Sequence, residues 1–256
     1  MKIQDLFSVA GKTVVITGGS RGIGEMIARA YVDNGATVIL TSRNASDVEG
    51  LAAELGSAAH AIPADLSQMA EIERFAAEVA KLTPKVDVLF NNAGASWGAE
   101  FDSFPEIGWD KVMDINVKSV FFLTQRLIKL LEAAATPDSY ARVINIGSID
   151  GQHVSGIETY SYAASKAAVL HLTRMMAKNL AGRHIAVNAI APGYFPSKMT
   201  AGIAEEFAAG SLAATPMQRR GTPSDMAGVA LFLGSAASAF LCGSVVTVDG
   251  GYATTV

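Results

Sequence analysis

The chain has 256 residues, of which half are hydrophobic and 17% are charged, and its formal net charge is −4. This composition provides for a sizeable buried core, and without any basic run we expect neither nucleic acid nor a membrane as a partner. One cysteine and four scattered histidines predict neither an internal disulfide nor a bound metal. The start lacks a signal-peptide pattern, and no stretch of the chain is long and apolar enough to span a membrane, so we expect a cytoplasmic protein.

Short apolar runs alternate along the chain with longer helix-like stretches. The strand candidates are 13–17, 37–41, 60–64, 86–90, 142–146, 185–190 and 244–249. The helix candidates are 22–33, 45–55, 69–82, 106–132, 160–181 and 223–234. Continuous apolar runs bounded by turn residues, with helices between them, predict an α/β fold with a seven-stranded, mostly parallel sheet that is covered by helices on both faces. No repeat or linker divides the chain, so we expect residues 1–256 to form a single domain.

A glycine-rich segment, TGGSRGIG at 17–24, follows the first predicted strand and precedes the first predicted helix. Glycines let the backbone turn sharply and approach a pyrophosphate closely, and the N-terminus of a helix attracts phosphate. The segment therefore predicts a dinucleotide site, although glycines needed only for packing would give a similar pattern. Its candidate cofactor-binding residues are Gly18, Ser20, Arg21, Gly22, Ile23 and Gly24.

The end of the second predicted strand bears on which dinucleotide is bound. Ser42 and Arg43 stand where NAD enzymes place an acidic residue, and no Asp or Glu lies between 34 and 46. Arg43 and Arg21 could together hold the 2′-phosphate of NADP. We therefore predict NADP(H) as the cofactor, the alternative being that both arginines are solvated surface residues.

The segment ETYSYAASK at 158–166 contains two tyrosines and one lysine. On a helix Tyr162 and Lys166 share a face, whereas Tyr160 points elsewhere. A nearby ammonium would lower the pKa of Tyr162, so that the phenol could exchange a proton with a carbonyl or an alcohol oxygen. Ordinary helix packing can produce the same spacing.

Six segments in order resemble the short-chain dehydrogenase/reductase family: TGGSRGIG, NNAG at 91–94, DINVKSVF, NIGS, YAASK and PG at 192–193. The resemblance implies a doubly wound Rossmann domain. It also implies that Tyr162 is the general acid/base, that Lys166 and Ser148 assist it, and that Asn116 holds a proton relay. The further cofactor-binding residues that it implies, beside Tyr162 and Lys166, are Asp65, Leu66, Asn92, Ala93, Gly94, Pro192, Gly193, Phe195 and Ser197.

The substrate side is expected around a lid at 194–216, for which a packed helical insertion is the alternative interpretation. By family position the pocket candidates are Trp97, His153, Tyr194 and Met199. His153 could equally be a surface loop residue, and Asp150, near the expected pocket mouth, makes a carboxylate substrate less attractive. The apolar character of the lid predicts a bulky or long-chain ketone.

The resulting interpretation is an NADPH-dependent carbonyl reductase, an alcohol dehydrogenase in reverse. The stretches SWG at 96–98, ARVINIGS and IAPGYFPSKMT resemble 3-oxoacyl reductases of the rhamnolipid-associated type, so a 3-oxoacyl-(acyl-carrier-protein) reductase is the alternative. A sugar or steroid dehydrogenase and a catalytically inactive NADP-binding regulator are further alternatives. Apolar residues on the predicted helices 106–132 and 160–181 suggest a homotetramer or a homodimer.

Overall fold

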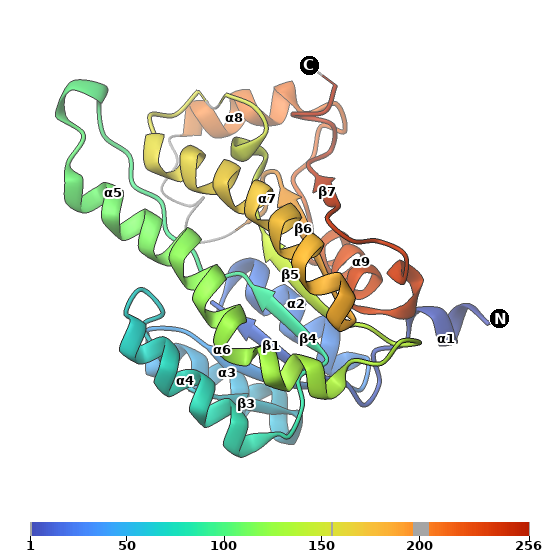
Figure 1. Cartoon of the computed structure of the whole chain (residues 1–256). Coiled ribbons are helices and arrows are strands. Elements are labelled where there is room, and N and C mark those ends of the chain that lie inside the picture. The colour runs from blue at the N-terminus through green and yellow to red at the C-terminus, as the bar shows by residue number, and fades with distance from the viewer. Residues whose placement is uncertain (1, 155, 197–204, 256) are drawn as a thin grey trace.

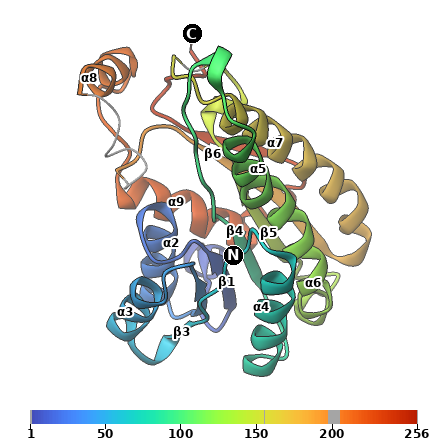
Figure 2. The ribbon, with the colours of Figure 1, turned by 90° about the vertical axis from the view of Figure 1, so that its left-hand side faces the viewer.

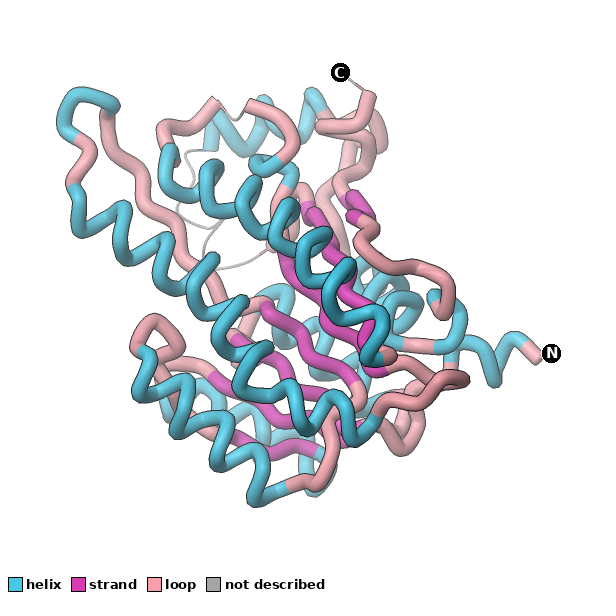
Figure 3. Tube along the Cα trace, viewed as in Figure 1, coloured by secondary structure: helices cyan, strands magenta, loops and turns pink. Residues whose placement is uncertain are grey.

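The computed structural model describes residues 2–154, 156–196 and 205–255. A seven-stranded sheet in the order β3-β2-β1-β4-β5-β6-β7 crosses its centre, and all six strand pairings are parallel (Figures 1 and 3). The strands are β1 Thr13–Thr17, β2 Thr37–Thr41, β3 Ala59–Ala61, β4 Val88–Asn91, β5 Ala141–Ile146, β6 Ile185–Pro192 and β7 Val245–Val248. The predicted α/β fold is thereby confirmed.

Helices form a layer on each face of the sheet. Figure 2 shows α2, α3 and α9 on one side and α4, α5, α6 and α7 on the other. Their bounds are α1 Ile3–Phe7, α2 Gly22–Asp33, α3 Ala45–Leu55, α4 Met69–Leu82, α5 Glu106–Met113, α6 Ser119–Ala134, α7 Tyr160–Leu180, α8 Glu205–Ala214 and α9 Pro223–Gly234.

The two layers account for the unbroken apolar runs of the strands. Successive side chains of a strand point to opposite faces, so each face needs its own apolar set. In β1, Ile16 packs in the cluster that includes α2 and α9, whereas Val15 packs in the cluster that includes α4 and α6. Both residues are fully buried. A polar residue at either position would be buried without water, which is costly.

The strand order places the site. The chain reverses the direction in which it adds strands beside β1, because β2 and β3 lie to one side and β4 to β7 to the other. Ligands of open parallel sheets bind outside the carboxyl ends of the strands at such a switch point. The glycine loop after β1 and the NNAG segment after β4 both lie there.

Some predicted element bounds were wrong. The third strand stops at Ala61 instead of continuing to 64, consistent with Pro63, which has no N–H to donate to a strand ladder. The single predicted helix at 106–132 is two helices joined by a π-helical segment, Asp114–Lys118. The helices α1 and α8 were not among the predicted elements, and α8 lies within the predicted lid segment.

Candidate active site

Ser148 and Tyr162 meet at the carboxyl end of β5. Ser148 lies two residues after the end of the strand and precedes a short 3₁₀ turn, Ile149–Gly151, in which its hydroxyl oxygen accepts a hydrogen bond from the Asp150 N–H at 3.1 Å. The Ser148 side chain also hydrogen-bonds Tyr162, which lies in the first turn of α7. Two hydroxyl groups from separate elements are therefore held side by side.

Lys166 lies one helical turn after Tyr162 and is 5% exposed. Its Nζ donates a hydrogen bond to the Ile146 carbonyl at 2.8 Å and lies 5.5 Å from the centre of the Tyr162 ring. Burial disfavours the charged ammonium and lowers the pKa of Lys166 to about 8, although the Asp150 carboxylate opposes this effect. The lowered pKa of Lys166 still leaves its ammonium mostly charged at neutral pH.

The expected effect of Lys166 on the tyrosine is not seen in this structure. Burial, reinforced by Asp150, raises the pKa of Tyr162 to about 12, and the hydrogen bond from Ser148 only partly offsets the rise. Lys166 does not lower this pKa, because its ammonium lies over the Tyr162 ring and donates its hydrogen bond to the Ile146 carbonyl. The Tyr162 phenol is accordingly protonated throughout the neutral range.

Asn116 is brought to the same place by the π-helical segment between α5 and α6. It is 1% exposed, and its side chain spans two elements: Oδ1 accepts from the Ala95 N–H at 2.8 Å, and Nδ2 donates to Ser165 Oγ of α7 at 2.8 Å. Single π-helical turns inside helices are frequent at functional sites. The wider turn fixes this part of the chain against α7 beside Lys166.

Tyr160 points away from these groups. Its hydroxyl donates to Glu158 Oε1 at 2.8 Å, and its ring packs edge-on against Phe101 and Phe104. The side chain is exposed at the surface. The prediction from helical spacing that Tyr160 points away from Lys166 is therefore confirmed.

The glycine loop forms a cradle at the N-terminus of α2, which has no side-chain cap. Gly18 and Gly22 have φ values of 62° and 56°, which favour glycine. A Cβ on Gly18 would lie 2.9 Å from Ala93 Cα, and one on Gly24 would collide with the Gly18 carbonyl oxygen. Ser20 and Ile23 lie in the same turn. The backbone thus leaves close access to uncapped N–H groups, which fits a pyrophosphate.

The NNAG segment supports that loop from β4. Asn92 Nδ2 donates to the carbonyl oxygens of Thr17 and Gly18 at 2.8 and 3.1 Å, and the Ala93 N–H donates to Thr17 Oγ1 at 2.8 Å. A Cβ on Gly94 would approach Asn116 Oδ1 to 3.2 Å. The NNAG segment therefore contacts both the glycine loop and Asn116.

The far end of the cradle contains the residues proposed to select the cofactor. Ser42 Oγ donates to the Asn44 carbonyl at 2.9 Å, and Arg43 is exposed. Arg21 lies 3.9 Å from Asp47, a carboxylate in the first turn of α3 that no sequence motif singled out. Nearby, Asp65 Oδ1 accepts two hydrogen bonds from Ser67, and Leu66 is buried.

The end of β6 closes the other side of the site. The Gly193 N–H donates to the Val248 carbonyl at 2.9 Å, and Pro192 is the last residue of the strand. Phe195 is buried against Gly221, where a Cβ would collide with its ring. Tyr194 and Phe195 line a cavity of about 340 Å³ together with residues before α9 and after β7.

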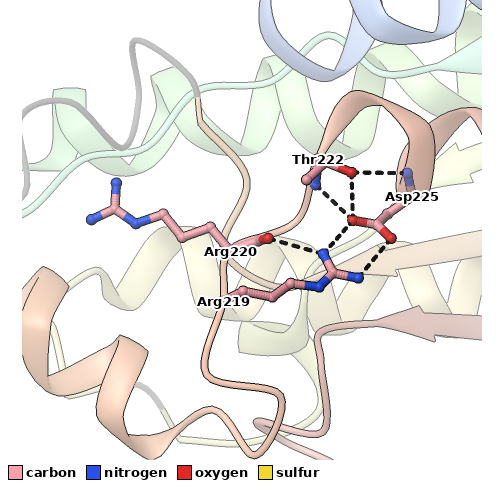
Figure 4. Close-up of polar contacts among 4 residues, drawn as sticks. All are labelled: Arg219, Arg220, Thr222 and Asp225. Atoms are coloured by element: carbon pink, nitrogen blue, oxygen red, sulfur yellow. Dashed lines mark hydrogen bonds and ion pairs between the residues drawn. The ribbon is translucent and has the colours of Figure 1, made fainter.

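A fixed turn before α9 forms one wall of this cavity. Thr222 caps α9 in a reciprocal capping box with Asp225 (Figure 4). Arg219 donates hydrogen bonds to both carboxylate oxygens of Asp225, at 2.6 and 2.9 Å. These bonds hold the pKa of Asp225 well below its usual range. Arg220 extends in the opposite direction (Figure 4). No local signal in the sequence pointed to this turn.

A line of polar and aromatic side chains runs from the catalytic turn to α8. His153 Nε2 lies 3.8 Å from Asp150 Oδ1, and the His153 ring packs on Tyr252. Tyr252 in turn meets Tyr194 edge-on, and Tyr194 hydrogen-bonds Ser211 of α8. The structure thus brings His153 and Tyr194 together. Tyr252 and Ser211 are distant in the sequence and were missed, because only the fold makes them neighbours.

The remaining pocket candidates are placed differently. Trp97 packs against α5, where a Cβ on Gly108 would lie 2.7 Å from its ring and Lys111 Nζ lies 5.0 Å from the ring centre. Its contacts are therefore those of a packing residue. Ser197 and Met199 lie outside the described residues.

Neither a cluster of metal ligands nor a membrane-spanning helix is found in the part of the chain that the structure describes. Within residues 2–154, 156–196 and 205–255, no three His, Cys, Asp or Glu side chains gather as metal ligands would. Over the same ranges, no helix has the length and apolar character needed to cross a membrane.

Comparison with known proteins agrees with this geometry. The family model described as enoyl-(acyl carrier protein) reductase matches residues 18–253. A rhamnolipids biosynthesis 3-oxoacyl-[acyl-carrier-protein] reductase of Pseudomonas aeruginosa is 46% identical over 96% of this chain and 98% of its own length. The chain belongs to the short-chain dehydrogenase/reductase family. It is thus an oxidoreductase whose family acts on CH–OH and C=O groups.

Relatives within the family differ in what they act on. A 5-keto-D-gluconate 5-reductase of Escherichia coli is 38% identical over 97% of this chain and 98% of its own. The solved Pseudomonas aeruginosa RhlG/NADP active-site complex superposes with a TM-score of 0.94 at 45% identity, covering 97% of this chain and 99% of that one. A gluconate 5-dehydrogenase of Burkholderia cenocepacia, solved with NADP and tartrate, superposes with a TM-score of 0.92 at 31% identity over the whole of both chains.

Proposed function

We propose that the protein is an NADPH-dependent carbonyl reductase that transfers a hydride to a ketone, and that it oxidises the secondary alcohol in reverse. The observation that carries the proposal is the gathering of Ser148, Tyr162 and Lys166 at the carboxyl end of β5, beside the uncapped glycine loop. The choice of NADP is supported by Ser42 and Arg43 at the end of β2, and by the two similar proteins solved with NADP.

The residues of the chain have distinct roles in this proposal. NADPH, when bound, supplies the hydride. Tyr162 holds the proton that the carbonyl oxygen needs, and the Ser148 hydroxyl donates a hydrogen bond to the same oxygen as its charge grows. Lys166 keeps a positive charge beside the tyrosine, and Asn116 fixes α7 in register with the NNAG segment.

The proposed substrate is a bulky or long-chain ketone, with a 3-oxoacyl-(acyl-carrier-protein) thioester as the alternative. The aromatic rings of Tyr194 and Tyr252 beside His153 support a large substrate, and the 46% identical relative supports the thioester. A polyhydroxylated keto substrate is a second candidate, because Asp150, His153 and Tyr194 form a polar wall and two similar proteins act on gluconate or its 5-keto derivative.

A panel of carbonyl compounds tests the proposal. NADPH consumption is measured with a bulky aryl ketone, a long-chain 3-oxoacyl thioester, a short 3-oxoester and 5-keto-D-gluconate at equal concentrations. We expect the two large apolar substrates to be preferred. Preference for 5-keto-D-gluconate would move the assignment to the second candidate, and consumption with none of them would contradict the proposed function.

We also propose a homotetramer, or at least a homodimer, formed through the outer faces of α5, α6 and α7. Large apolar side chains are exposed on these helices, among them Trp109, Phe121 and Met175. Light scattering at micromolar concentration is expected to report a multiple of 26.7 kDa, and a monomer would contradict this assembly. A cytoplasmic location stays a prediction.

A further inference from the structure

Asp150 occupies a fixed place beside the catalytic pair. Its N–H is bonded to Ser148 Oγ at 3.1 Å, and the next residue, Gly151, lies directly on α7. A Cβ on Gly151 would be 2.7 Å from the carbonyl carbon of Lys166 and 2.8 Å from the Ala167 nitrogen. The turn that carries the carboxylate is therefore pressed against the helical turn that carries Lys166.

The other side of the same turn is fixed as well. Gln152 Oε1 accepts a hydrogen bond from Thr247 Oγ1 of β7 at 3.0 Å, and His153 packs on Tyr252. The Asp150 side chain is 19% exposed. The turn that carries the carboxylate is thus held in position from β5, α7 and β7, and the Asp150 side chain is largely removed from water.

The titratable groups that face Asp150 come from every element around it. They are His153 at 3.8 Å on its own turn, Tyr162 and Lys166 on α7, and Tyr194 after β6, which contacts Tyr252 of the C-terminal segment. Burial raises the pKa of Asp150, while His153 and Lys166 hold it down. Among the described residues, Asp150 is the carboxylate whose charge acts on both Lys166 and Tyr162.

We propose that Asp150 is a positioning residue for proton transfer, the counter-ion that keeps Tyr162 and Lys166 protonated and so sets the pH range over which the site reduces carbonyl groups. A negative charge beside both groups favours their proton-bound forms. During reduction the carbonyl carbon gains the hydride and its oxygen gains the Tyr162 proton, so the phenol must be protonated beforehand. Oxidation needs the opposite state, a phenolate that can accept the proton of the alcohol.

The test is Asp150→Asn, which removes the charge and keeps the shape. The pH profiles of kcat/KM are measured for ketone reduction with NADPH and for alcohol oxidation with NADP⁺. We expect the alkaline limit of reduction and the onset of oxidation both to move to lower pH by about one unit. Asp150→Glu is expected to restore the wild-type profile.

Two controls separate this role from a structural one. Asp138→Asn removes a carboxylate from an exposed loop and is expected to leave both profiles unchanged. If Asp150→Asn lowers activity equally at all pH values, or if its profiles superpose on those of the wild type, the counter-ion role is wrong.

The inference rests on the proposed function for its reaction. A second measurement tests it without any substrate. A rapid pH jump followed by ultraviolet difference spectra records tyrosine ionisation before unfolding. The difference from the matching Tyr162→Phe enzyme isolates Tyr162, with and without Asp150→Asn. Ionisation of Tyr162 at lower pH in the Asn variant supports the role, and unchanged ionisation overturns it. Failure of the carbonyl panel alone would contradict only the proposed function.

Discussion

Replacing Lys166 by methionine is expected to stabilise the fold while abolishing turnover. The ammonium is 5% exposed, and burial lowers its pKa from the ordinary 10.5 to about 8. Each pKa unit corresponds to about 1.4 kcal/mol, so keeping Lys166 charged in the folded protein at neutral pH costs about 3 kcal/mol. Methionine has a similar length and no charge, and it removes that cost.

The loss of a hydrogen bond made by Lys166 reduces this gain in stability. Lys166 Nζ donates to the Ile146 carbonyl at 2.8 Å, and a hydrogen bond from a charged group contributes about 1.5–3 kcal/mol. The net stabilisation is therefore about 1 kcal/mol, which corresponds to about 3 °C in Tm for a chain of this size. The matched control is Lys178→Met, an exposed position on the same helix, where a change within about 0.5 kcal/mol is expected.

The stability advantage of Lys166→Met over the wild type is expected to depend on pH. Below pH 8 the folded and unfolded chains both carry a charged Lys166, and the folded chain bears the full cost. Between about 8 and 10.5 the folded chain releases the proton first, so the wild type gains stability with rising pH and the advantage of Lys166→Met shrinks. Thermal unfolding at pH 7 and pH 10 measures the difference. A variant less stable than the wild type at pH 7, or an advantage that does not depend on pH, would refute this reasoning.

Three further predictions concern cofactor and substrate. The double change Ser42→Asp and Arg43→Ala is expected to shift the preference from NADPH towards NADH by at least about tenfold in kcat/KM, since a charge-assisted hydrogen bond contributes about 1.5–3 kcal/mol; efficient use of NADH by the wild type would contradict the assignment. Gly24→Ala places a Cβ against Gly18 and is expected to weaken NADPH binding at least about tenfold in a fluorescence titration, whereas Gly50→Ala, which has open space around it, should bind normally. In a homologous series of 3-oxoesters kcat/KM is expected to rise with chain length, at about 0.8 kcal/mol for each buried methylene, and to rise less in Tyr194→Ala; a flat series would refute an apolar pocket.

Much of the fold could be predicted because burial on both faces of a parallel sheet leaves a clear pattern. Val14, Val15 and Ile16 are all fully buried, and three consecutive apolar side chains do not suit a strand that has one face in water. The break in the helix at 114–118 could not be predicted, because the local residues are compatible with a continuous helix and the deviation depends on contacts with α7 through Asn116.

The grouping of Tyr162 with Lys166 was predictable for a different reason. Tyr162 and Lys166 are related by one helical turn, so their spacing alone places them together. The contacts that connect His153 with Tyr252 and, through Tyr194, with Ser211 join distant segments, so no local sequence pattern could predict them. The pKa of Tyr162 was expected in the wrong direction, since spacing gives proximity to Lys166 but does not reveal that burial dominates.

The central claim is that Tyr162 carries the proton in carbonyl reduction, and a comparison of two single-atom changes tests it most directly. NADPH consumption with the preferred ketone is measured for the wild type, Tyr162→Phe and Tyr160→Phe, together with NADPH affinity by fluorescence. Loss of a general acid typically lowers the rate by about 10²–10⁴-fold, so we expect at least that loss in Tyr162→Phe with NADPH binding retained. Tyr160, whose hydroxyl bonds to Glu158 at the surface, should retain substantial activity as phenylalanine. Equal losses in the two variants, or full activity in Tyr162→Phe, would contradict the account.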